Sequence, residues 1–238
     1  MSFEEEVLSK DPNYPTYTRK YWGWLDSCAK KVSADIINIT DIKNKKILGI
    51  GTGHGRIEAI LGKNGAKIIG IDIDPRELFF AKKRMLYNNI SNYSFIVADG
   101  GKLPFKSNIF DMAYANSVLE HTDNYQKFIS EMLRVLEKGG FFYITGINAL
   151  RIEKRLIIKL RHIFSKSNKK PSGYKIKHFF TPFKIKKELR GTDHFFWHEE
   201  PRYIKHPLKR IIEGVLAKFK ILPYLRQELV VIGTKNSY

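Results

Sequence analysis

Three glycines at alternate positions, Gly51, Gly53 and Gly55, form the pattern in this sequence that most directly suggests a binding site. They follow a β-branched run at 47–50 and precede a helical pattern, so a strand, a tight turn and a helix start are predicted to meet there. Glycines let the backbone approach a ligand closely, and a helix start presents unpaired N–H groups to it. The spacing is not G-x-G-x-x-G, so dinucleotide binding is not indicated, and an ordinary strand-to-helix turn is the alternative.

An acidic residue follows the next apolar run. Asp72 ends that run 21 positions after Gly51, where a doubly wound α/β domain places the carboxylate that binds ribose hydroxyls. Asp72 could instead cap the helix that Pro75 opens, but Asp74 is better placed for capping. Asp72 is therefore a candidate ribose ligand.

Two further polar residues follow later predicted strands. Asp99 comes directly after the apolar run 93–98, where a carboxylate can accept a hydrogen bond from an adenine amine. Asn116 lies at the tip of the strand predicted to begin at 110.

Five alternations of strand and helix are predicted to position these residues. The helical spacing of 129–137 stops at 138–140, and 141–145 is the fifth strand. This order predicts a mostly parallel sheet with right-handed crossovers, in which ligands bind beyond the carboxyl ends of the strands. The residues expected to converge there are Gly51, Asp72, Asp99 and Asn116.

Five ordered motifs resemble those of the class I S-adenosylmethionine-dependent methyltransferases, particularly the ubiquinone/menaquinone and other small-molecule methyltransferases. They are the glycine triplet 51–55, Gly-Ile-Asp-Ile-Asp-Pro at 70–75, Asp-Gly-x-x-Leu-Pro-Phe at 99–105, Phe-Asp at 110–111 with Val-Leu-Glu-His at 118–121, and Arg-Val-Leu-x-x-Gly-Gly at 134–140. The resemblance covers 45–146. It implies an α/β fold, a doubly wound Rossmann-like sheet of seven strands that is mostly parallel, with an antiparallel last strand and helices on both faces.

The resemblance also implies S-adenosyl-L-methionine as the cofactor. The glycine turn would hold its methionyl part, Asp72 its ribose and Ile73 its adenine face, while Asp99 and Gly100 would contact the polar edge of the adenine and Asn116 would lie near the sulfonium. The full set of implied cofactor-binding residues is Ile50, Gly51, Thr52, Gly53, Gly55, Asp72, Ile73, Asp99, Gly100 and Asn116.

Two positions depart from the family pattern. Gly49 stands where the family usually has an acidic residue oriented toward the amino group of the cofactor. Lys138 stands in an exposed turn where the family has proline. The first departure motivates one alternative, a non-catalytic protein that only binds the cofactor.

Composition indicates one basic domain. At 238 residues the chain can bury one substantial core, so 1–238 is expected to form a single methyltransferase domain. Its parts are an aromatic cap at 1–44, the cofactor-binding core at 45–146, a basic substrate-side insertion at 147–191, and the last strands with an outer helix at 192–238. One cysteine, an acidic N-terminus without an apolar segment, and no long apolar run favour a cytoplasmic protein.

Aromatic residues are dense in 11–30, ahead of the first predicted strand. They are expected to pack against the edge of the sheet, or else to form a lid that excludes water from the cofactor. Either arrangement allows Tyr17 or Tyr21 to reach the substrate pocket.

Positive charge is concentrated after the fifth strand. The net charge is +18, and residues 151–220 hold 20 lysines and arginines against 6 acidic residues. Residues 150–164 are predicted to form a basic amphipathic helix that covers the mouth of the site or lies on a membrane surface. Thr181 and Pro182 are predicted to start a later helix that ends before Gly191.

Beyond these, 192–199 is expected to form the sixth strand, 207–219 an outer helix and 228–234 the last strand. In the family a histidine ahead of a similar Phe-Thr-Pro helix start lies near the substrate pocket, which makes His178 a candidate pocket residue. His121 and His178 are the candidate catalytic bases, although His121 could equally make a polar contact at a helix start. No metal is expected, because His194 and His198 lack ligand spacing in a strand.

The leading hypothesis is a small-molecule methyltransferase, most plausibly an O-methyltransferase. Its acceptor would be anionic, or related to lipids or glycans, because the basic insertion would attract such a ligand and could hold the protein at a membrane surface. An RNA methyltransferase is the alternative, but 115–118 lacks the tetrad of exocyclic-amine enzymes and no recognition module is appended, so no specific nucleic acid is expected. The sequence does not indicate the oligomeric state.

Overall fold

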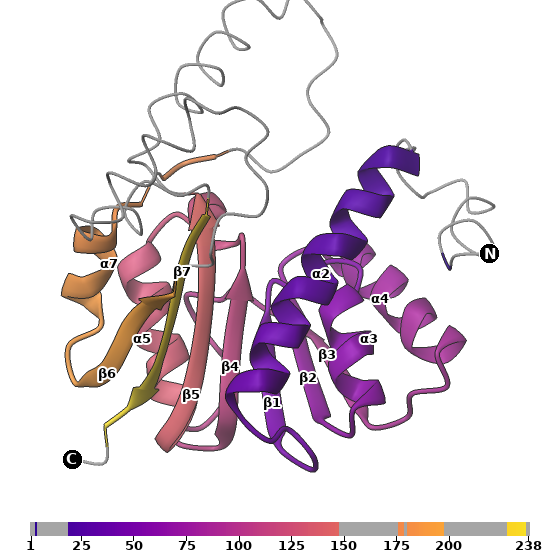
Figure 1. Cartoon of the computed structure of the whole chain (residues 1–238), viewed down its shortest axis with the longest axis horizontal. Coiled ribbons are helices and arrows are strands. Elements are labelled where there is room, and N and C mark those ends of the chain that lie inside the picture. Colours follow the sequence, from indigo (N-terminus) through magenta and orange to yellow (C-terminus); the bar gives the residue numbers. More distant parts are fainter. Residues whose placement is uncertain (1–2, 4–18, 148–175, 179, 198–227, 237–238) are drawn as a thin grey trace, which may run out of the picture.

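A seven-stranded sheet organises the chain. The computed structural model describes Phe3 and residues 19–147, 176–178, 180–197 and 228–236. The strand order is β3-β2-β1-β4-β5-β7-β6, and the crossover between β1 and β4 marks the point where the winding reverses (Figure 1). The strands are β1 Lys46–Ile50, β2 Lys67–Asp72, β3 Tyr93–Val97, β4 Phe110–Asn116, β5 Leu136–Ile147, β6 Thr192–Trp197 and β7 Glu228–Lys235.

The pairing confirms the predicted fold class. Strands β1 to β5 pair in parallel, and β7 runs antiparallel to both β5 and β6. Ile50 lies opposite Ile71 on one side and Ala115 on the other, so the carboxyl ends of β1, β2 and β4 reach the same edge. The polar residues that follow these strands therefore gather at that edge.

Helices cover both faces of the sheet (Figure 1). The helices are α2 Arg19–Ile39, α3 Arg56–Lys63, α4 Pro75–Tyr87, α5 Tyr125–Val135 and α7 Pro182–Glu188, with a 3₁₀ turn, η2, at Leu119–His121. Residues of α2 and α3 share a core with Ile47 of β1, whereas α5 and α7 share another with Leu48. Successive residues of β1 thus point to opposite faces, as the alternation of side chains in a strand requires.

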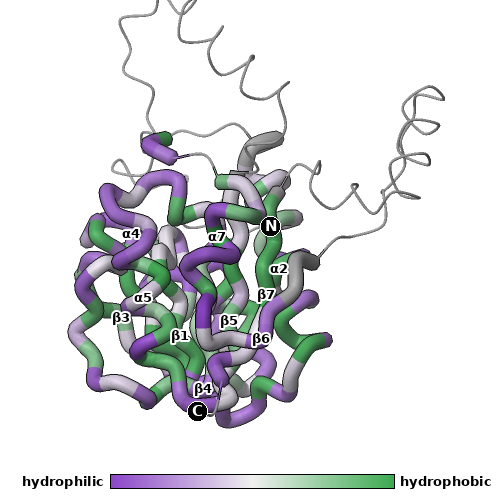
Figure 2. The backbone as a smooth tube through the Cα atoms, turned by 90° about the vertical axis from the view of Figure 1, so that its left-hand side faces the viewer, coloured by the Kyte–Doolittle hydropathy of each residue, from purple (hydrophilic) through white to green (hydrophobic). Residues whose placement is uncertain are grey.

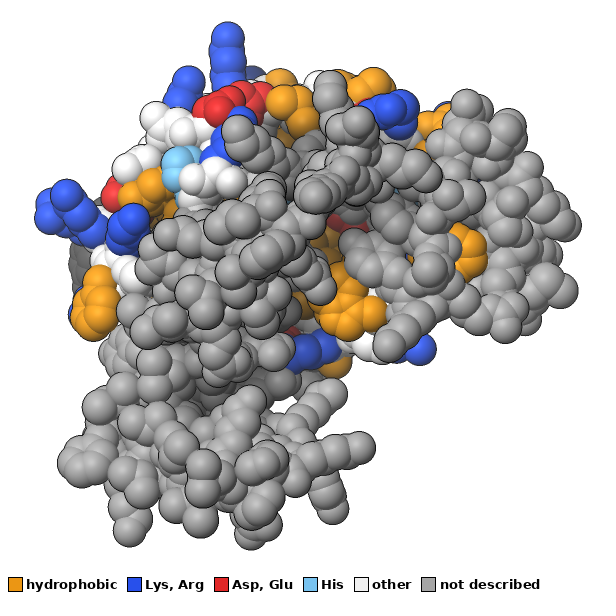
Figure 3. All heavy atoms as spheres, turned by 90° about the horizontal axis from the view of Figure 1, so that it is seen from above, with side chains coloured by type: hydrophobic (Ala, Val, Ile, Leu, Met, Phe, Trp, Pro, Cys, Tyr) orange, Lys and Arg blue, Asp and Glu red, His pale blue; other side chains and the backbone are white. Residues whose placement is uncertain are grey.

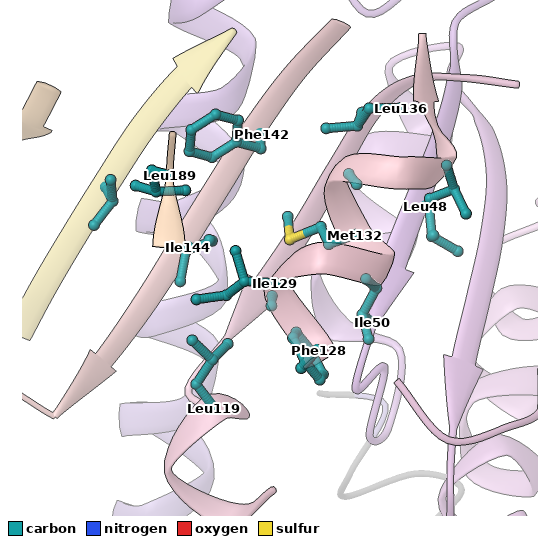
Figure 4. Packing of buried hydrophobic residues seen from close by; sticks show 14 of the residues in the cluster. Leu48, Ile50, Leu119, Phe128, Ile129, Met132, Leu136, Phe142, Ile144 and Leu189 are labelled. Carbon is teal, nitrogen blue, oxygen red and sulfur yellow. The ribbon is translucent and has the colours of Figure 1, made fainter. Parts of the chain in front are cut away.

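The core under α5 is the larger of the two. Phe128, Ile129 and Met132 of α5 are fully buried against β4 and β5 (Figure 4). In Figure 2, where the backbone is coloured by hydropathy, hydrophobic residues lie in the central strands and hydrophilic ones in the outer turns. Burial of these side chains, at about 25 cal/mol per Å² of apolar surface, is the main force that holds the edge of the sheet in place.

Two predictions about elements were wrong. Helix α5 ends at Val135 rather than at 137, because Leu136 already pairs with Phe110 in the sheet and the turn then follows at Gly139, whose φ is 75°. The long-range pairing of β5 with β4 overrides the local helical spacing that continues to 137.

The second wrong prediction concerns the connection between β3 and β4. This connection contains no helix, so the strict alternation of strand and helix stops there.

Several predicted segments lie outside the described residues. These are the basic helix at 150–164, the outer helix at 207–219 and the end of the predicted sixth strand at 198–199. Among the helices that the structure does describe, none is long and apolar enough to cross a membrane.

Candidate functional site

The glycine turn joins β1 to α3 at the edge of the sheet. Gly51, Gly53 and Gly55 all have positive φ, between 52° and 77°. A Cβ on Gly51 would collide with Val118, and one on Gly55 would lie 2.9 Å from the Cβ of Ala81. A Cβ on Gly53 would lie 3.7 Å from the Oε2 of Glu77, an ordinary van der Waals distance, so neighbouring atoms do not crowd this position. The first and third glycines permit close packing, whereas at the second the positive φ, rather than crowding, favours glycine.

The Asp72 carboxylate links the end of β2 to the glycine turn by a hydrogen bond. One carboxylate oxygen accepts the Gly53 N–H at 2.9 Å, and the other accepts the Asp74 N–H at 3.0 Å. The residue is only 8 % exposed, and burial raises the pKa of its carboxyl. Each oxygen can accept a further hydrogen bond, so the carboxylate can still bind the hydroxyls of a ribose.

Asp74, not Asp72, caps helix α4. The Asp74 carboxylate accepts the backbone N–H of Arg76 at 2.9 Å, and Pro75 occupies the first helical position. The sequence predicted this division of roles, which leaves Asp72 outside the helix. Because Asp72 does not cap the helix, its carboxylate can bind a ligand.

An exposed apolar surface lies beside Asp72. Ile73 is 64 % exposed, and Val97, which pairs with Asp72 across β2 and β3, is 55 % exposed. The sequence interpretation missed Val97, although its place directly before Ala98 and Asp99 could have indicated it. Large apolar side chains left in solvent at a sheet edge suit the flat face of an aromatic ring.

The turn after β3 supplies the polar edge of the same region. The Asp99 carboxylate accepts the Gly101 N–H at 2.8 Å and stays solvent-accessible. Gly100 has no room for a side chain, because a Cβ there would collide with Phe128. Gly100 therefore lets the turn pack closely on α5, while Asp99 faces outward.

Asn116 is held at the tip of β4. Its side-chain oxygen accepts a hydrogen bond from the Thr145 hydroxyl at 2.7 Å, and that hydroxyl accepts the Ser117 N–H at 3.0 Å. Thr145 is buried in β5, directly opposite Asn116. This pairing fixes the orientation of the Asn116 amide.

The two candidate histidines come from segments that lie side by side. His121 ends η2, and the backbone N–H groups of Lys177 and His178 both donate to the carbonyl of Glu120, at 2.7 and 3.1 Å. The His178 ring packs edge-on against Tyr125, with 5.4 Å between ring centroids. Two segments far apart in the sequence therefore share one corner of the sheet edge.

The N-terminal helix is attached to the glycine turn from the other side. Asp26 of α2 accepts the Arg56 guanidinium at 2.8 Å, and His54 in the turn contacts Glu77 of α4 at 2.9 Å. Ala29, Val32 and Ile36 of α2 are buried against the sheet. Tyr21 lies in α2 without a described side chain, and Tyr17 lies outside the described residues.

Glu58 and Tyr114 form a buried pair beneath the turn that the sequence interpretation missed. The Tyr114 hydroxyl donates to the Glu58 carboxyl at 2.5 Å, and Glu58 is 1 % exposed. Burial raises the pKa of Glu58 to about 7 and that of Tyr114 well above its usual value. The unusual Gly49 was the one sequence signal that pointed to this place.

The residues at this edge fit the implied cofactor. The uncrowded backbone at Gly53 suits an aminoacyl arm, the Asp72 carboxylate suits a ribose, and Ile73 with Val97 suits an adenine ring. Seen from above this edge, Figure 3 shows lysine and arginine side chains around the rim of the described surface.

Comparisons with known proteins agree with this geometry. The profile of the family described as "Methyltransferase domain" matches residues 41–206. The chain is 36 % identical over 122 residues to a sterol 4-C-methyltransferase of Caenorhabditis elegans, with 50 % of this chain and 36 % of that protein covered. It is 34 % identical over 161 residues to a putative protein N5-glutamine methyltransferase of Methanocaldococcus jannaschii, with 58 % of this chain and 75 % of that protein covered.

Among solved structures, magnesium protoporphyrin IX methyltransferase from Synechocystis, with bound S-adenosylhomocysteine, has a TM-score of 0.62 at 15 % identity, covering 89 % of this chain and 83 % of that one. At this identity the likeness shows the fold. The matched segment spans between about a third and three quarters of the two curated relatives.

Proposed function

The chain belongs to the methyltransferase-domain family, as a class I S-adenosylmethionine-dependent methyltransferase, and on that basis we propose that it methylates a hydroxyl group of a small anionic or lipid- or glycan-related acceptor. The observation that carries the proposal is the convergence of the glycine turn, the Asp72 carboxylate and the exposed Ile73 at one edge of the sheet.

Each end of the cofactor has matching residues at this edge. Asp72 would accept hydrogen bonds from the ribose, and Ile73 and Val97 would cover the adenine, whose amine would donate to Asp99. The turn at Gly53 would hold the aminoacyl arm, next to Thr52 and Gly51. The cofactor supplies a methyl group on a positively charged sulfur, so the protein's contribution is to orient the acceptor against it.

The charge distribution supports an anionic acceptor. Residues 151–220 carry 20 basic and 6 acidic residues, and the described helix α7 exposes Lys184, Lys186 and Lys187. A positive field near the mouth of a site raises the local concentration of anions. Phe183, 69 % exposed among these lysines, is compatible with an acceptor that has an apolar part or lies in a membrane.

His121 and His178 are the proposed proton acceptors. A hydroxyl must lose its proton by the end of methyl transfer, and an imidazole can accept it near neutral pH. Both residues lie on the segments joined at the Glu120 carbonyl, after the tip of β4 where Asn116 is fixed. This arrangement favours a role on the acceptor side of the edge.

Calorimetry with S-adenosylmethionine and S-adenosylhomocysteine tests the cofactor, and transfer of a labelled methyl group tests the acceptor. We expect micromolar binding and label in a small-molecule extract but not in total RNA. Absence of cofactor binding would overturn the proposal, and label in RNA alone would replace it with RNA methylation. RNA binding through several lysines would also weaken by orders of magnitude between about 50 and 200 mM salt.

A further inference from the structure

The space beside Gly49 is filled by side chains from two other elements. A Cβ on Gly49 would lie 2.5 Å from the Oε1 of Glu58, in α3, and 2.8 Å from the hydroxyl oxygen of Tyr114, in β4. No side chain fits at position 49 while Glu58 and Tyr114 keep their places. The glycine at 49 and the acid at 58 are therefore structurally linked.

Glu58 is a buried acid without a cationic partner in the part of the chain that the structure describes. It lies in the first turn of α3, 1 % exposed, and accepts a hydrogen bond from the hydroxyl of Tyr114. The nearby charge that acts on it is Asp72, which is also negative. Burying a carboxyl costs free energy unless a counter-charge is present, so this position demands an explanation.

A cationic ligand in the glycine turn would supply that counter-charge. The Thr52 hydroxyl in the turn donates to the carbonyl of Gly49 at 3.4 Å, and the Glu58 carboxyl lies where a side chain at Gly49 would start, so the carboxyl is next to the strand end that leads into the turn. An aminoacyl arm carries a carboxylate and an ammonium. The N-terminus of α3 favours the first group, and the ammonium next to it is favoured by a negative charge.

We propose that Glu58 is a positioning residue that provides the negative charge for the ammonium end of the cofactor, in place of an acid at position 49. The inference rests on the proposed function. Because Glu58 is buried, its carboxylate acts on the ammonium group through its electrostatic field and not by direct contact. This field is strong because the protein interior screens charges poorly.

The proposal makes cofactor affinity depend on pH. The groups that face Glu58 are Tyr114 from β4, Thr52 from the turn and Asp72 from β2, and the negative charge of Asp72 raises the pKa of Glu58 further. Since the pKa of Glu58 lies at about 7, its carboxylate forms as the pH rises through that value. Affinity for a ligand with an ammonium group should therefore increase from about pH 5.5 to about pH 8.

Two ligands separate the field of Glu58 from its role in packing. S-adenosylhomocysteine has the aminoacyl arm, whereas 5′-methylthioadenosine lacks it but has the same adenine and ribose. In Glu58→Gln at about pH 8, we expect calorimetry to show roughly tenfold weaker binding of S-adenosylhomocysteine and unchanged binding of 5′-methylthioadenosine. The variant should also lose the increase in affinity with pH.

Tyr114→Phe is the matched control, because it removes the hydrogen bond and keeps the carboxylate. It should retain the preference for S-adenosylhomocysteine. The triple variant Gly49→Asp/Glu58→Ala/Tyr114→Phe removes the two atoms that lie closest to a Cβ at position 49 and moves the acid there. It should restore that preference to within about threefold of wild type.

The outcomes discriminate between the two proposals. If Glu58→Gln binds S-adenosylhomocysteine like wild type, or loses both ligands equally, Glu58 has only a structural role and the inference is overturned. If the wild-type protein binds neither ligand, the proposed function itself fails.

Discussion

The proposed cofactor side and the proposed acceptor side of this sheet edge are built in different ways. Around the glycine turn, backbone groups make the decisive contacts: Gly53 donates to Asp72, and Gly51 and Thr52 donate to the carbonyl of Ile71. On the acceptor side, the segments of His121 and His178 are brought together by two hydrogen bonds to a single carbonyl, that of Glu120. The first side joins the neighbouring strands β1 and β2 through a turn with positive φ at its glycines, whereas the second joins two segments that lie far apart in the sequence.

The largest expected effect tests the glycine turn. Gly53→Val should abolish binding of S-adenosylhomocysteine, because a β-branched side chain disfavours the φ of 52° and blocks the close approach of a ligand to the turn. Gly139→Val is the matched control, since Gly139 has a φ of 75° and a Cβ added there would meet nothing within 4 Å. Both variants should lose about 1–2 kcal/mol of unfolding free energy, and only the first should lose the ligand. Normal binding by a folded Gly53→Val would show that the turn is purely structural.

The next largest effect tests the acceptor side. If a hydroxyl is the acceptor, His121→Ala or His178→Ala should lower turnover by roughly 100-fold, the lower range for a lost general base. Cofactor affinity, measured by calorimetry, should stay within about twofold of wild type, because both histidines lie outside the turn. Full turnover in both variants would remove them from the mechanism.

A smaller effect separates the ribose ligand from the helix cap. Asp72→Ala should weaken S-adenosylhomocysteine binding by well over 1 kcal/mol, because a hydrogen bond to a charged group is lost. Asp74→Ala should instead reduce stability by about 0.5–2 kcal/mol through loss of the α4 cap, with affinity unchanged. Equal affinity in wild type and Asp72→Ala would contradict the ribose assignment.

The buried acid predicts a pH dependence of stability without ligand. The pKa of Glu58 is raised to about 7, so the folded state holds its proton where the unfolded chain has lost it. Its contribution is therefore fully present below the unfolded pKa and declines, by on the order of 3 kcal/mol, as the pH rises through about 7. Denaturant titrations should show this decline in the wild type and not in Glu58→Gln. A similar decline in both proteins would assign it to other groups.

The smallest effect is expected for the exposed charges of α7. Replacing Lys184, Lys186 and Lys187 by alanine should change turnover of a small acceptor less than about threefold, because exposed charges are screened by salt. Steady-state kinetics at two ionic strengths would measure it. If the substitutions greatly lower turnover, and high salt lowers the turnover of the wild type to a similar extent, the acceptor contacts many basic groups, as RNA does.

Local sequence determined much of the cofactor side. The glycine spacing, Asp72 at the end of β2 and the Asp74-Pro75 helix start are short-range patterns, and each of these elements lies where it was predicted. The alternation of strands and helices likewise predicted a sheet buried on both faces. Such features can be predicted because capping, φ preference and strand periodicity act within a few residues.

Tertiary structure decided the rest. Tyr114 meets Glu58 across 56 positions of sequence, and His178 meets the His121 segment only because its backbone hydrogen-bonds to Glu120. The early end of α5 has the same origin, since Leu136 pairs with Phe110 in the sheet. Contacts of this kind depend on the packing of elements that are distant in the sequence. The residues of the glycine turn could therefore be predicted from the sequence, whereas the position of Glu58 next to that turn could not.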